Sequence, residues 1–344
     1  MRSVLRSEDR SMNSKTIVTC FPLDESHVDQ IRAVAKNDFD VLVSDQDRIA
    51  EDIFQADVFC GHAKVPVDWD GVVAREKLTW IQSSAAGLDH CLTPPVIQSP
   101  IVVSGCSGLF APQVAEQMMS LLMGLVRRAP LFFKAQQKKE FVRLPTDDIF
   151  GKTVGIIGMG GNGHRIARVL RPMVDRIIGT DCFPEACHEI IDEGTVEKVF
   201  PADELESVLP LCDVVIVTLP LSASNEKRIA EGQLALFKQG AYLVNVGRGS
   251  VVDTDSLVRS LQSGHLAGAG IDVVDPEPLP PESALWAMDN VTISPHVGAQ
   301  SPLRIPATIE LFCENLERFR DNRPLLNLVD KELGFPRPEN RIKL

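Results

Sequence analysis

The sequence predicts an α/β fold with two domains, each built on a doubly wound parallel sheet. The chain has 344 residues, more than one domain usually holds, and 44% of them are hydrophobic, which is enough to fill two cores. Short apolar runs alternate with helical segments along residues 15–104, and again along residues 153–294. A glycine-rich turn opens the second series and joins an apolar strand to a helix.

The glycine-rich turn is the most informative stretch of the sequence. An uncharged apolar run at 154–157 predicts a buried parallel strand, and the apolar spacing over 162–174 predicts a helix. Gly158, Gly160 and Gly163 fall where the strand becomes the helix. Such positions need a tight turn, a bare backbone beside a pyrophosphate, and close packing of the helix on the strand. The turn therefore predicts a dinucleotide site.

A second apolar strand, residues 176–180, runs into Asp181. This acid follows the first glycine by about 20 residues, the spacing of a carboxylate that binds an adenosine ribose. A glycine-rich turn followed by an incidental surface Asp is the alternative interpretation. The order of strand, turn, helix, strand and acid favours the dinucleotide site. Because the charge of Asp181 repels a 2′-phosphate, we expect NAD in preference to NADP.

Composition and charge narrow the class of protein. The net charge of −12 argues against a nucleic-acid or membrane-surface partner, so we expect small-molecule ligands. The eight cysteines include no CxxC pair and lie mostly in apolar stretches, which indicates buried thiols, no metal site and a reducing, cytoplasmic location. No apolar run reaches about 18 residues, and residues 1–14 are polar, so we expect neither a membrane span nor a secretory signal. We expect residues 1–14 to be a disordered extension.

The first series predicts an α/β domain of its own. Its apolar strands are expected at 16–20, 39–43, 58–61, 78–83 and 101–104, with a helix at 26–35. The turn Ser83–His90 follows one of these strands and begins with small residues. Small side chains leave backbone N–H groups free to hold an anion. A purely structural turn explains the same residues equally well.

A strongly apolar helix is expected at Ala111–Val126, where it carries the chain into the second domain. Its methionines are interpreted as core or interface side chains. Because this helix is too apolar for a lone surface helix, we expect a homodimer. The later elements of the second domain are strands at 213–220, 241–247, 269–273 and 291–294 and helices near 232–237 and 253–263. A helix at 305–320 and the tail 325–329 have no nearby sheet partner and are expected to return to the first domain.

Three polar residues follow strands of the second domain: Arg248, Glu277 and His296. In a doubly wound sheet the ligand crevice lies outside the carboxyl ends of the strands, so these side chains are expected to converge. An Arg binds the carboxylate and carbonyl of a 2-oxo acid, and a His exchanges the hydroxyl proton. A Glu beside the imidazole favours its charged form and orients the ring. Each residue alone has an ordinary structural explanation, but the combination favours catalysis.

The motifs around these residues closely resemble those of the D-isomer-specific 2-hydroxyacid dehydrogenases, and the resemblance runs from about Leu78 to Val329. The matching segments are Ala86–His90, the glycine loop, Gly247–Asp253, Ala267–Val273 followed by Pro276–Leu279, and Asn290–Val291 with Pro295–His296. The resemblance implies a Rossmann NAD domain (111–299) inserted into a flavodoxin-like substrate domain (15–110 and 300–344). It also implies hydride transfer between NAD and a D-2-hydroxy acid or its 2-oxo acid.

Site residues follow from the same resemblance. It places the catalytic residues at Arg248, Glu277 and His296, and the substrate contacts at Ala86, Gly87 and Arg248. Asp272 takes the place of the acid that faces the nicotinamide carboxamide. The implied cofactor contacts are Gly158, Gly160, Gly161, Asn162, Gly163, Asp181, Thr218, Leu219, Pro220, Val246, Gly247, Arg248, Asp272, His296 and Gly298.

The chain departs from the family pattern at several positions. Asn162 stands where the family usually has Ile, Thr218 where it often has His, and Phe141 where a Trp is common. The only Tyr, Tyr242, lies inside a predicted strand, so no phenol is expected near the substrate. The alternative function is a regulatory or corepressor-like scaffold that keeps the fold and binds NAD. Phosphoglycerate oxidation is a further possibility within the enzyme class.

Overall fold

The computed structural model describes residues 14–343, and the chain divides into two compact units. One unit takes the chain up to Ser107 together with Pro302–Lys343, and the other takes Gly108–Ser301. The extension predicted for residues 1–14 lies outside the described residues except for Ser14. The predicted domain boundaries, after 110 and after 299, lie a few residues from those of the units.

The first unit has a parallel sheet of five strands in the order β2-β1-β3-β4-β5. The strands are β1 (Lys15–Cys20), β2 (Phe39–Val43), β3 (Val58–Gly61), β4 (Trp80–Ser83) and β5 (Val102–Ser104). This is the flavodoxin-like order: successive strands are added on one side of β1 first and then, from β3 onward, on its other side. Every residue of β3 and β4 is buried, as expected for central strands that are covered on both faces.

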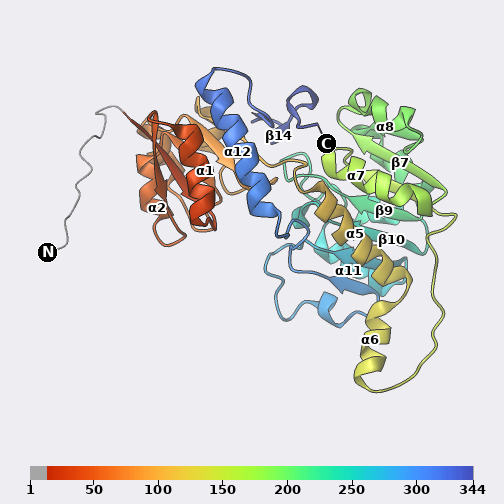
Figure 1. The fold of residues 1–344 in the computed structure, drawn as a ribbon. Helices are drawn as coiled ribbons and strands as arrows, with labels where there is room; N and C mark the ends of the chain where they lie inside the picture. The colour runs from red at the N-terminus through yellow and green to blue at the C-terminus, as the bar shows by residue number, and fades with distance from the viewer. Residues whose placement is uncertain (1–13, 344) are drawn as a thin grey trace. The chain divides into compact units, whose positions relative to one another are not determined.

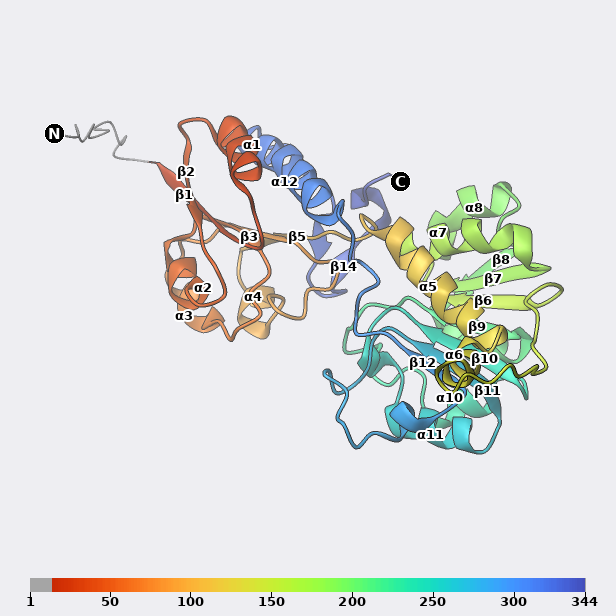
Figure 2. The ribbon, with the colours of Figure 1, turned by 60° about the horizontal axis from the view of Figure 1, so that its bottom comes forward.

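Helices cover both faces of this sheet. One face packs against α2 (Ile49–Asp52), α3 (Trp69–Ala74) and α4 (Pro94–Gln98). The other face packs against α1 (Glu25–Ala35) and α12 (Arg304–Arg320), which lie side by side in Figure 1 and Figure 2. Helix α12 supplies Ile309, Phe312 and Leu316 to the core, so the end of the chain completes the unit in which the chain began.

Buried amides attach the C-terminal tail to the first sheet. Asn315 is fully buried and donates to Oε1 of Gln82 at 2.9 Å and to the carbonyl of Leu326 at 3.0 Å. Its own oxygen accepts from the N–H of Leu326 at 2.7 Å. Leu328 then forms an antiparallel bridge with Ser104. Strands β13 (Val329–Asp330) and β14 (Phe335–Pro336) pair with each other in a small antiparallel sheet.

The second unit has a parallel sheet of seven strands in the order β12-β11-β10-β9-β6-β7-β8. The strands are β6 (Thr153–Ile157), β7 (Arg176–Asp181), β8 (Lys198–Pro201), β9 (Val214–Val217), β10 (Ala241–Asn245), β11 (Leu266–Ile271) and β12 (Val291–Ile293). The chain moves outward from β6 to β8 and then returns to the other side of β6, so the direction reverses between β6 and β9. This is the Rossmann order with one further strand. The predicted fold class is confirmed.

Two layers of helices enclose this sheet (Figure 2). One core contains α5 (Ala111–Val126), α7 (Gly161–Leu170) and α8 (His188–Asp192), and the other contains α9 (Leu205–Val208), α10 (Glu231–Ala235) and α11 (Thr254–Gln262). Helix α6 (Ala129–Gln137) has no buried residue. Met118 of α5 is fully buried, whereas Met119 and Met123 are partly buried against the core. Most of the apolar surface of α5 is therefore covered within its own unit.

Several element bounds differ from the predicted ones by a few residues, and two of these differences have a clear physical reason. The helix predicted over 162–174 ends as an α-helix at Leu170, because Pro172 lies in the 3-10 turn that follows. The strand predicted at 269–273 starts earlier, at Leu266, and ends at Ile271. Ala267 and Gly268 are small and resemble a turn in sequence, but Leu266 and Gly268 pair with β10 in the sheet.

Candidate active site

The glycine loop leaves β6 and enters α7 with the geometry that a pyrophosphate needs. Gly158 has φ +101°, a conformation that side chains other than glycine rarely adopt. A Cβ on Gly163 would lie 2.3 Å from the carbonyl oxygen of Gly158, so only glycine permits this close approach of helix to turn. A Cβ on Gly160 would meet no atom within 4 Å. The backbone is thus bare at the N-terminus of α7, and the residues present fit a dinucleotide.

Asp181 ends β7 and connects the glycine loop to the turn that follows β7. Its side chain is 8% exposed. One carboxylate oxygen accepts the N–H of Met159 at 2.8 Å, and the other accepts the N–H of Phe183 at 2.8 Å. These bonds fix the carboxylate beside the turn at Gly158. Each oxygen has a second lone pair with which to accept a further hydrogen bond.

Thr218 follows β9, on the other side of the point where the strand order reverses. Its hydroxyl donates to the carbonyl oxygen of Gly158 at 2.6 Å. The residue that departs from the family pattern therefore stabilises the glycine loop directly. Leu219 and Pro220 continue from it, and Gly247 approaches them closely: a Cβ on Gly247 would lie 2.5 Å from the carbonyl oxygen of Leu219.

His296 and Glu277 are in direct contact. Nδ1 of His296 lies 2.8 Å from Oε1 of Glu277, and the two side chains are 43% and 44% exposed. A carboxylate only accepts hydrogen bonds, so Nδ1 carries the hydrogen in this contact. The other ring nitrogen, Nε2, takes no part in the contact with Glu277. His296 adopts φ +54°, in the left-handed region. The convergence predicted for these two residues is present in the structure.

Arg248 follows β10 in a turn that Asn245 holds. The Asn245 side chain is 2% exposed, donates to the carbonyl of Arg248 at 3.0 Å and accepts the N–H of Gly247 at 3.0 Å. The Arg248 guanidinium donates to the carbonyl of Gly247 at 2.9 Å. The sequence analysis missed Asn245, although its place between a buried strand and a Gly-Arg-Gly turn was a usable signal.

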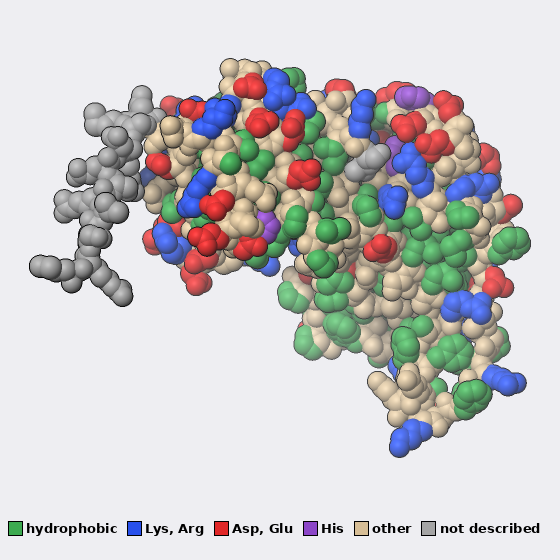
Figure 3. All heavy atoms as spheres, viewed as in Figure 1, with side chains coloured by type: hydrophobic (Ala, Val, Ile, Leu, Met, Phe, Trp, Pro, Cys, Tyr) green, Lys and Arg blue, Asp and Glu red, His purple; other side chains and the backbone are tan. Residues whose placement is uncertain are grey.

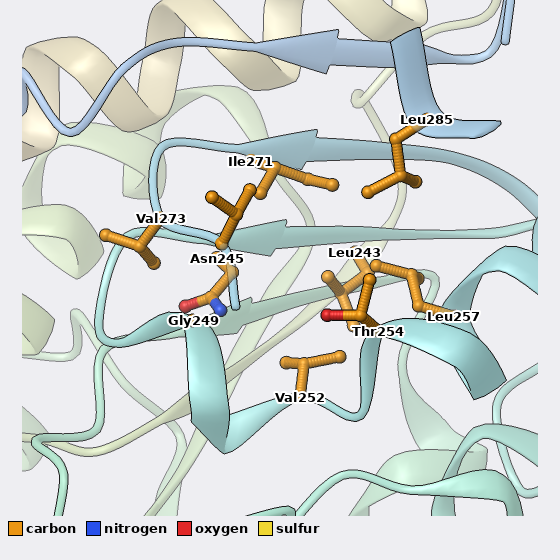
Figure 4. A pocket seen from close by; sticks show the side chains of 10 residues that line it. Leu243, Asn245, Gly249, Val252, Thr254, Leu257, Ile271, Val273 and Leu285 are labelled. Atoms are coloured by element: carbon orange, nitrogen blue, oxygen red, sulfur yellow. The ribbon is translucent and has the colours of Figure 1, made fainter. Parts of the chain in front are cut away.

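A small, mostly apolar pocket lies beneath this turn. Figure 4 shows Asn245 beside Gly249, with side chains from β10, β11 and α11 around the pocket. The hydroxyl of Thr254, one of the lining residues, donates to the carbonyl of Asp275 at 2.8 Å. This bond attaches the loop that carries Glu277 to the start of α11.

Asp253 caps α11 immediately after the Arg248 turn. Its carboxylate accepts the Ser256 hydroxyl at 2.6 Å and the Ser256 N–H at 3.1 Å, and Lys227 lies 3.0 Å away. The hydroxyl bond first, and then Lys227, lower the pKa of Asp253 to about 2. The carboxylate therefore stays charged at neutral pH and stabilises the helix end that follows the turn.

Asp272 lies at the end of β11 and is 3% exposed. One carboxylate oxygen accepts the N–H of Val297 at 3.0 Å and the hydroxyl of Ser294 at 2.7 Å. The other accepts the N–H of Gly298 at 2.8 Å. Both oxygens therefore hold the loop that carries His296, a role that the sequence analysis did not assign to this acid.

The remaining predicted residues fall into two groups. Gly161, Asn162 and Val246 lie at the same carboxyl edge of the seven-stranded sheet, after β6 and β10. Ala86 and Gly87 belong to the first unit, in the loop after β4. Of the described residues, none accepts a hydrogen bond from the backbone N–H groups of these two. The N–H of Cys106 donates to the carbonyl of Ala85 at 3.0 Å and so holds the loop.

Catalytic residue types thus follow three neighbouring strands: Arg248 after β10, Glu277 after β11 and His296 after β12. A sequence model of the NAD-binding domain of the D-isomer-specific 2-hydroxyacid dehydrogenases matches residues 119–298. The chain belongs to this family. It is therefore an enzyme, an oxidoreductase that interconverts 2-hydroxy and 2-oxo acids with a nicotinamide cofactor. The regulatory scaffold considered above is not favoured.

Individual family members show how similar the chain is to known proteins. It is 31% identical over 296 residues to a glyoxylate reductase of Korarchaeum cryptofilum, a match that covers 84% of this chain and 87% of that protein. It is 33% identical over 290 residues to an uncharacterized protein in the proB 3′ region of Corynebacterium melassecola, with 83% and 92% covered. The D-isomer-specific 2-hydroxyacid dehydrogenase of Xanthobacter autotrophicus Py2, solved with NADPH and MES, superposes with a TM-score of 0.76. That alignment has 26% identity and covers 93% of this chain and 99% of that chain.

Other classes of site were also considered. Over residues 14–343, no helix has the length and apolarity needed to cross a membrane. Within the same part of the chain, no group of three or more His, Cys, Asp or Glu side chains is arranged to hold a metal ion. None of the eight cysteines forms a disulfide; Cys182 is exposed and Cys313 half-buried, and the other six are buried as predicted.

The two glycines of the loop predict different outcomes on substitution. Gly160→Ala adds a methyl group in open space, so the free enzyme should keep its stability while NADH affinity falls about tenfold or more, because the methyl meets the pyrophosphate. Gly163→Ala should also lower the free energy of unfolding, by about 1 to 3 kcal/mol, because its Cβ meets backbone. NADH fluorescence titration and chemical denaturation measure both quantities.

Gly232→Ala in α10 is the matched control, since its Cβ also meets open space. This variant should bind NADH as the parent enzyme does. NADH affinity that stays unchanged in both loop variants would show that the pyrophosphate does not lie at this turn.

Proposed function

We propose that Arg248, Glu277 and His296 carry out the reduction of a 2-oxo acid in this enzyme. The contact between His296 and Glu277 at 2.8 Å is the observation that carries the proposal. Glu277 orients the ring through Nδ1 and leaves Nε2–H to act as the acid. The half-exposed state of both side chains allows a substrate oxygen to approach.

Each residue has a defined part in the reaction. When bound, the nicotinamide supplies the hydride that forms the new C2–H bond. As the carbonyl electron pair moves onto the substrate oxygen, His296 transfers its Nε2 proton to that oxygen and becomes neutral. The planar guanidinium of Arg248 binds the substrate and stabilises the negative charge that develops on the same oxygen. In the oxidative direction His296 takes the proton back.

We infer that the backbone N–H groups of Ala86 and Gly87 bind the substrate carboxylate. The side chains here are small, and the N–H groups of Ala86 and Gly87 donate to no acceptor within the described part of the chain. Neutral N–H donors hold a carboxylate well without adding a charge. The substrate itself we infer to be a small 2-oxo acid such as glyoxylate, because the relative in Korarchaeum cryptofilum carries that name.

The experiment that tests the reaction is NADH oxidation with glyoxylate, hydroxypyruvate, pyruvate, phenylpyruvate and phosphohydroxypyruvate. Turnover of any of them gives the substrate for the variants below. The phosphorylated acid tests phosphoglycerate oxidation in reverse. No turnover with any of these acids would contradict the proposed substrate class.

Removal of the acid should lower the rate far more than cofactor affinity. We expect His296→Gln to lower kcat/KM for reduction by roughly 10²- to 10⁴-fold, while NADH binding by fluorescence stays near that of the parent. The control His265→Gln changes a His that lies before β11, at the opposite edge of the sheet, where it contacts Gln239 and the carbonyl of Leu234. It should keep the parent rate. A parent rate in His296→Gln would mean that another residue is the acid.

Glu277→Gln should act mainly through the orientation of the imidazole. An amide oxygen accepts the Nδ1–H less strongly than a carboxylate does, so kcat/KM for reduction should fall while NADH binding stays near that of the parent. Glu282→Gln, an exposed acid of the same loop, is the control. Parent kcat/KM in Glu277→Gln would separate Glu277 from the proton-transfer step.

We propose that NAD(H) is preferred to NADP(H). Asp181 is fixed beside the glycine loop, and juxtaposing its charge with a 2′-phosphate costs on the order of several kcal/mol. The family fold alone does not decide this, because the Xanthobacter enzyme was solved with NADPH. We expect kcat/KM with NADH to exceed kcat/KM with NADPH at least about tenfold. The variant Asp181→Ala should bring the two values of kcat/KM closer together. Equal kcat/KM for both cofactors in the parent enzyme would contradict this preference.

We propose that the enzyme is a homodimer and that residues 129–150 form the interface. Phe133, Phe141 and Phe150 in this segment are 62%, 96% and 86% exposed. Figure 3 shows hydrophobic side chains on the surface of this region. A nine-residue helix such as α6, which has no fully buried residue in its own chain, gains little stability by itself. The interface is thus assigned to this segment and not to the methionines of α5.

Sedimentation velocity tests the dimer. The parent should sediment as a dimer at micromolar concentration, and the double variant F141D/F150D should sediment as a monomer, because a charge cannot be buried in an apolar interface without a partner. Leu236→Asp, at an exposed apolar site on the far side of the sheet from α5, is the control and should stay dimeric. A monomeric parent would contradict the proposal.

We infer a reducing compartment, the cytoplasm, for this enzyme. Six buried thiols and two more accessible ones, none of them in a disulfide, support this inference, because proteins in oxidising compartments use cysteines in disulfides.

A further inference from the structure

A hydrogen-bond chain joins α5 to the loop that carries His296. Nε2 of Gln117 donates to the Ser294 hydroxyl at 2.7 Å, and this hydroxyl donates to Asp272 at 2.7 Å. Asp272 in turn accepts the N–H groups of Val297 and Gly298. The chain therefore starts on a helix outside the sheet and ends at the two residues that follow His296.

The direction of this chain is determined by chemistry. A carboxylate accepts hydrogen bonds only, so the single proton of the Ser294 hydroxyl must point to Asp272. The hydroxyl oxygen is then free to accept, and the amide N–H₂ of Gln117 supplies the donor. An acceptor at position 117 would compete for the same proton.

The His296 loop needs such support. A φ of +54° costs energy for a residue with a side chain and persists only where the surroundings hold it. The N–H of His296 donates to the carbonyl of Asp272 at 2.7 Å, and the next two N–H groups go to the Asp272 carboxylate. One residue thus holds three consecutive N–H groups. The orientation of Asp272 consequently sets the orientation of His296.

Packing places Gln117 against the same loop. A Cβ built on Gly298 would lie 2.8 Å from Oδ2 of Asp272 and 3.8 Å from Cγ of Gln117. The stem of Gln117 and the Asp272 carboxylate therefore both border the backbone of Gly298.

We propose that Gln117 is a positioning residue for proton transfer, acting through Ser294 and Asp272 on His296. This proposal rests on the proposed role of His296 as the acid. Gln117 touches neither substrate nor reacting atoms. Its amide donates to the Ser294 hydroxyl, so the hydroxyl proton stays directed at the Asp272 carboxylate. That hydrogen bond holds Asp272 and the loop after His296 in place, and the imidazole therefore stays aligned with Glu277 and with the substrate oxygen.

The decisive variant is Gln117→Glu, which keeps the size of the side chain and replaces the donor by an acceptor. The Ser294 proton is then drawn away from Asp272, and the two carboxylates repel each other. We expect kcat/KM for reduction to fall about tenfold, the lower end of what the loss of a supporting hydrogen bond behind a catalytic ligand does in metal enzymes. The solvent isotope effect on kcat should increase as the proton transfer becomes slower.

Further variants separate positioning from simple structure. Ser294→Ala should lose activity as Gln117→Glu does, and Ser294→Thr, which keeps the hydroxyl, should retain the parent rate. Combining Gln117→Leu with Ser294→Ala should cost little more than Ser294→Ala alone, because the two residues act through one chain. Glu116→Gln, an exposed neighbour on α5, is the control. NADH affinity and the melting temperature should stay near parent values throughout.

Parent kcat/KM in Gln117→Glu, additive losses in the double variant, or losses matched by weaker NADH binding would each overturn the proposal. These outcomes are distinct from a failure of the proposed function. If His296→Gln is inactive while the Gln117 variants are fully active, His296 is the acid and Gln117 does not position it.

Discussion

Parallel pairing of every strand in the second sheet is the constraint on which the site depends. Because all seven strands run in the same direction, each ends at one edge, and the residue after each strand is delivered to that edge. Four residues of the site come from four different strands and lie far apart in the sequence: Gly158, Asp181, Arg248 and His296. The reversal of strand order between β6 and β9 leaves the space that a dinucleotide needs above the sheet. A single antiparallel strand among them would send its terminal residue to the other edge.

Two buried carboxylates make this edge rigid. Asp181 and Asp272 are 8% and 3% exposed, and their oxygens accept backbone N–H groups of the glycine loop and of the His296 loop. Burying a carboxylate is costly unless hydrogen bonds compensate, so each acid holds its loop in the one conformation that supplies the donors. The pair proposed to react is different: His296 and Glu277 are both more than two-fifths exposed. The groups that fix the backbone geometry are buried, and the two groups proposed for proton transfer stay accessible.

The comparison of α5 and α6 shows how burial changes an interpretation. Methionines at helical spacing predicted a helix with more apolar surface than its own domain would cover. The helix is present with the expected bounds. Packing against α7, β10 and β11 covers much of that surface. The aromatics that stay exposed lie in the following segment, which had no clear periodicity. Whether an apolar side chain meets its own core or solvent depends on neighbours that are distant in sequence.

The sequence by itself determined the two α/β units, the order of their elements, the glycine loop and the three residues that we propose for catalysis. These follow from local signals: an apolar period, a glycine where only glycine fits, and the chemistry of one side chain. Only the tertiary structure decided that Asn245 holds the Arg248 turn, that Asp272 holds the His296 loop, and that Gln117 reaches Ser294. Hydrogen bonds form between atoms that meet within about 3 Å, and that proximity arises from packing, which the local pattern of a sequence does not encode.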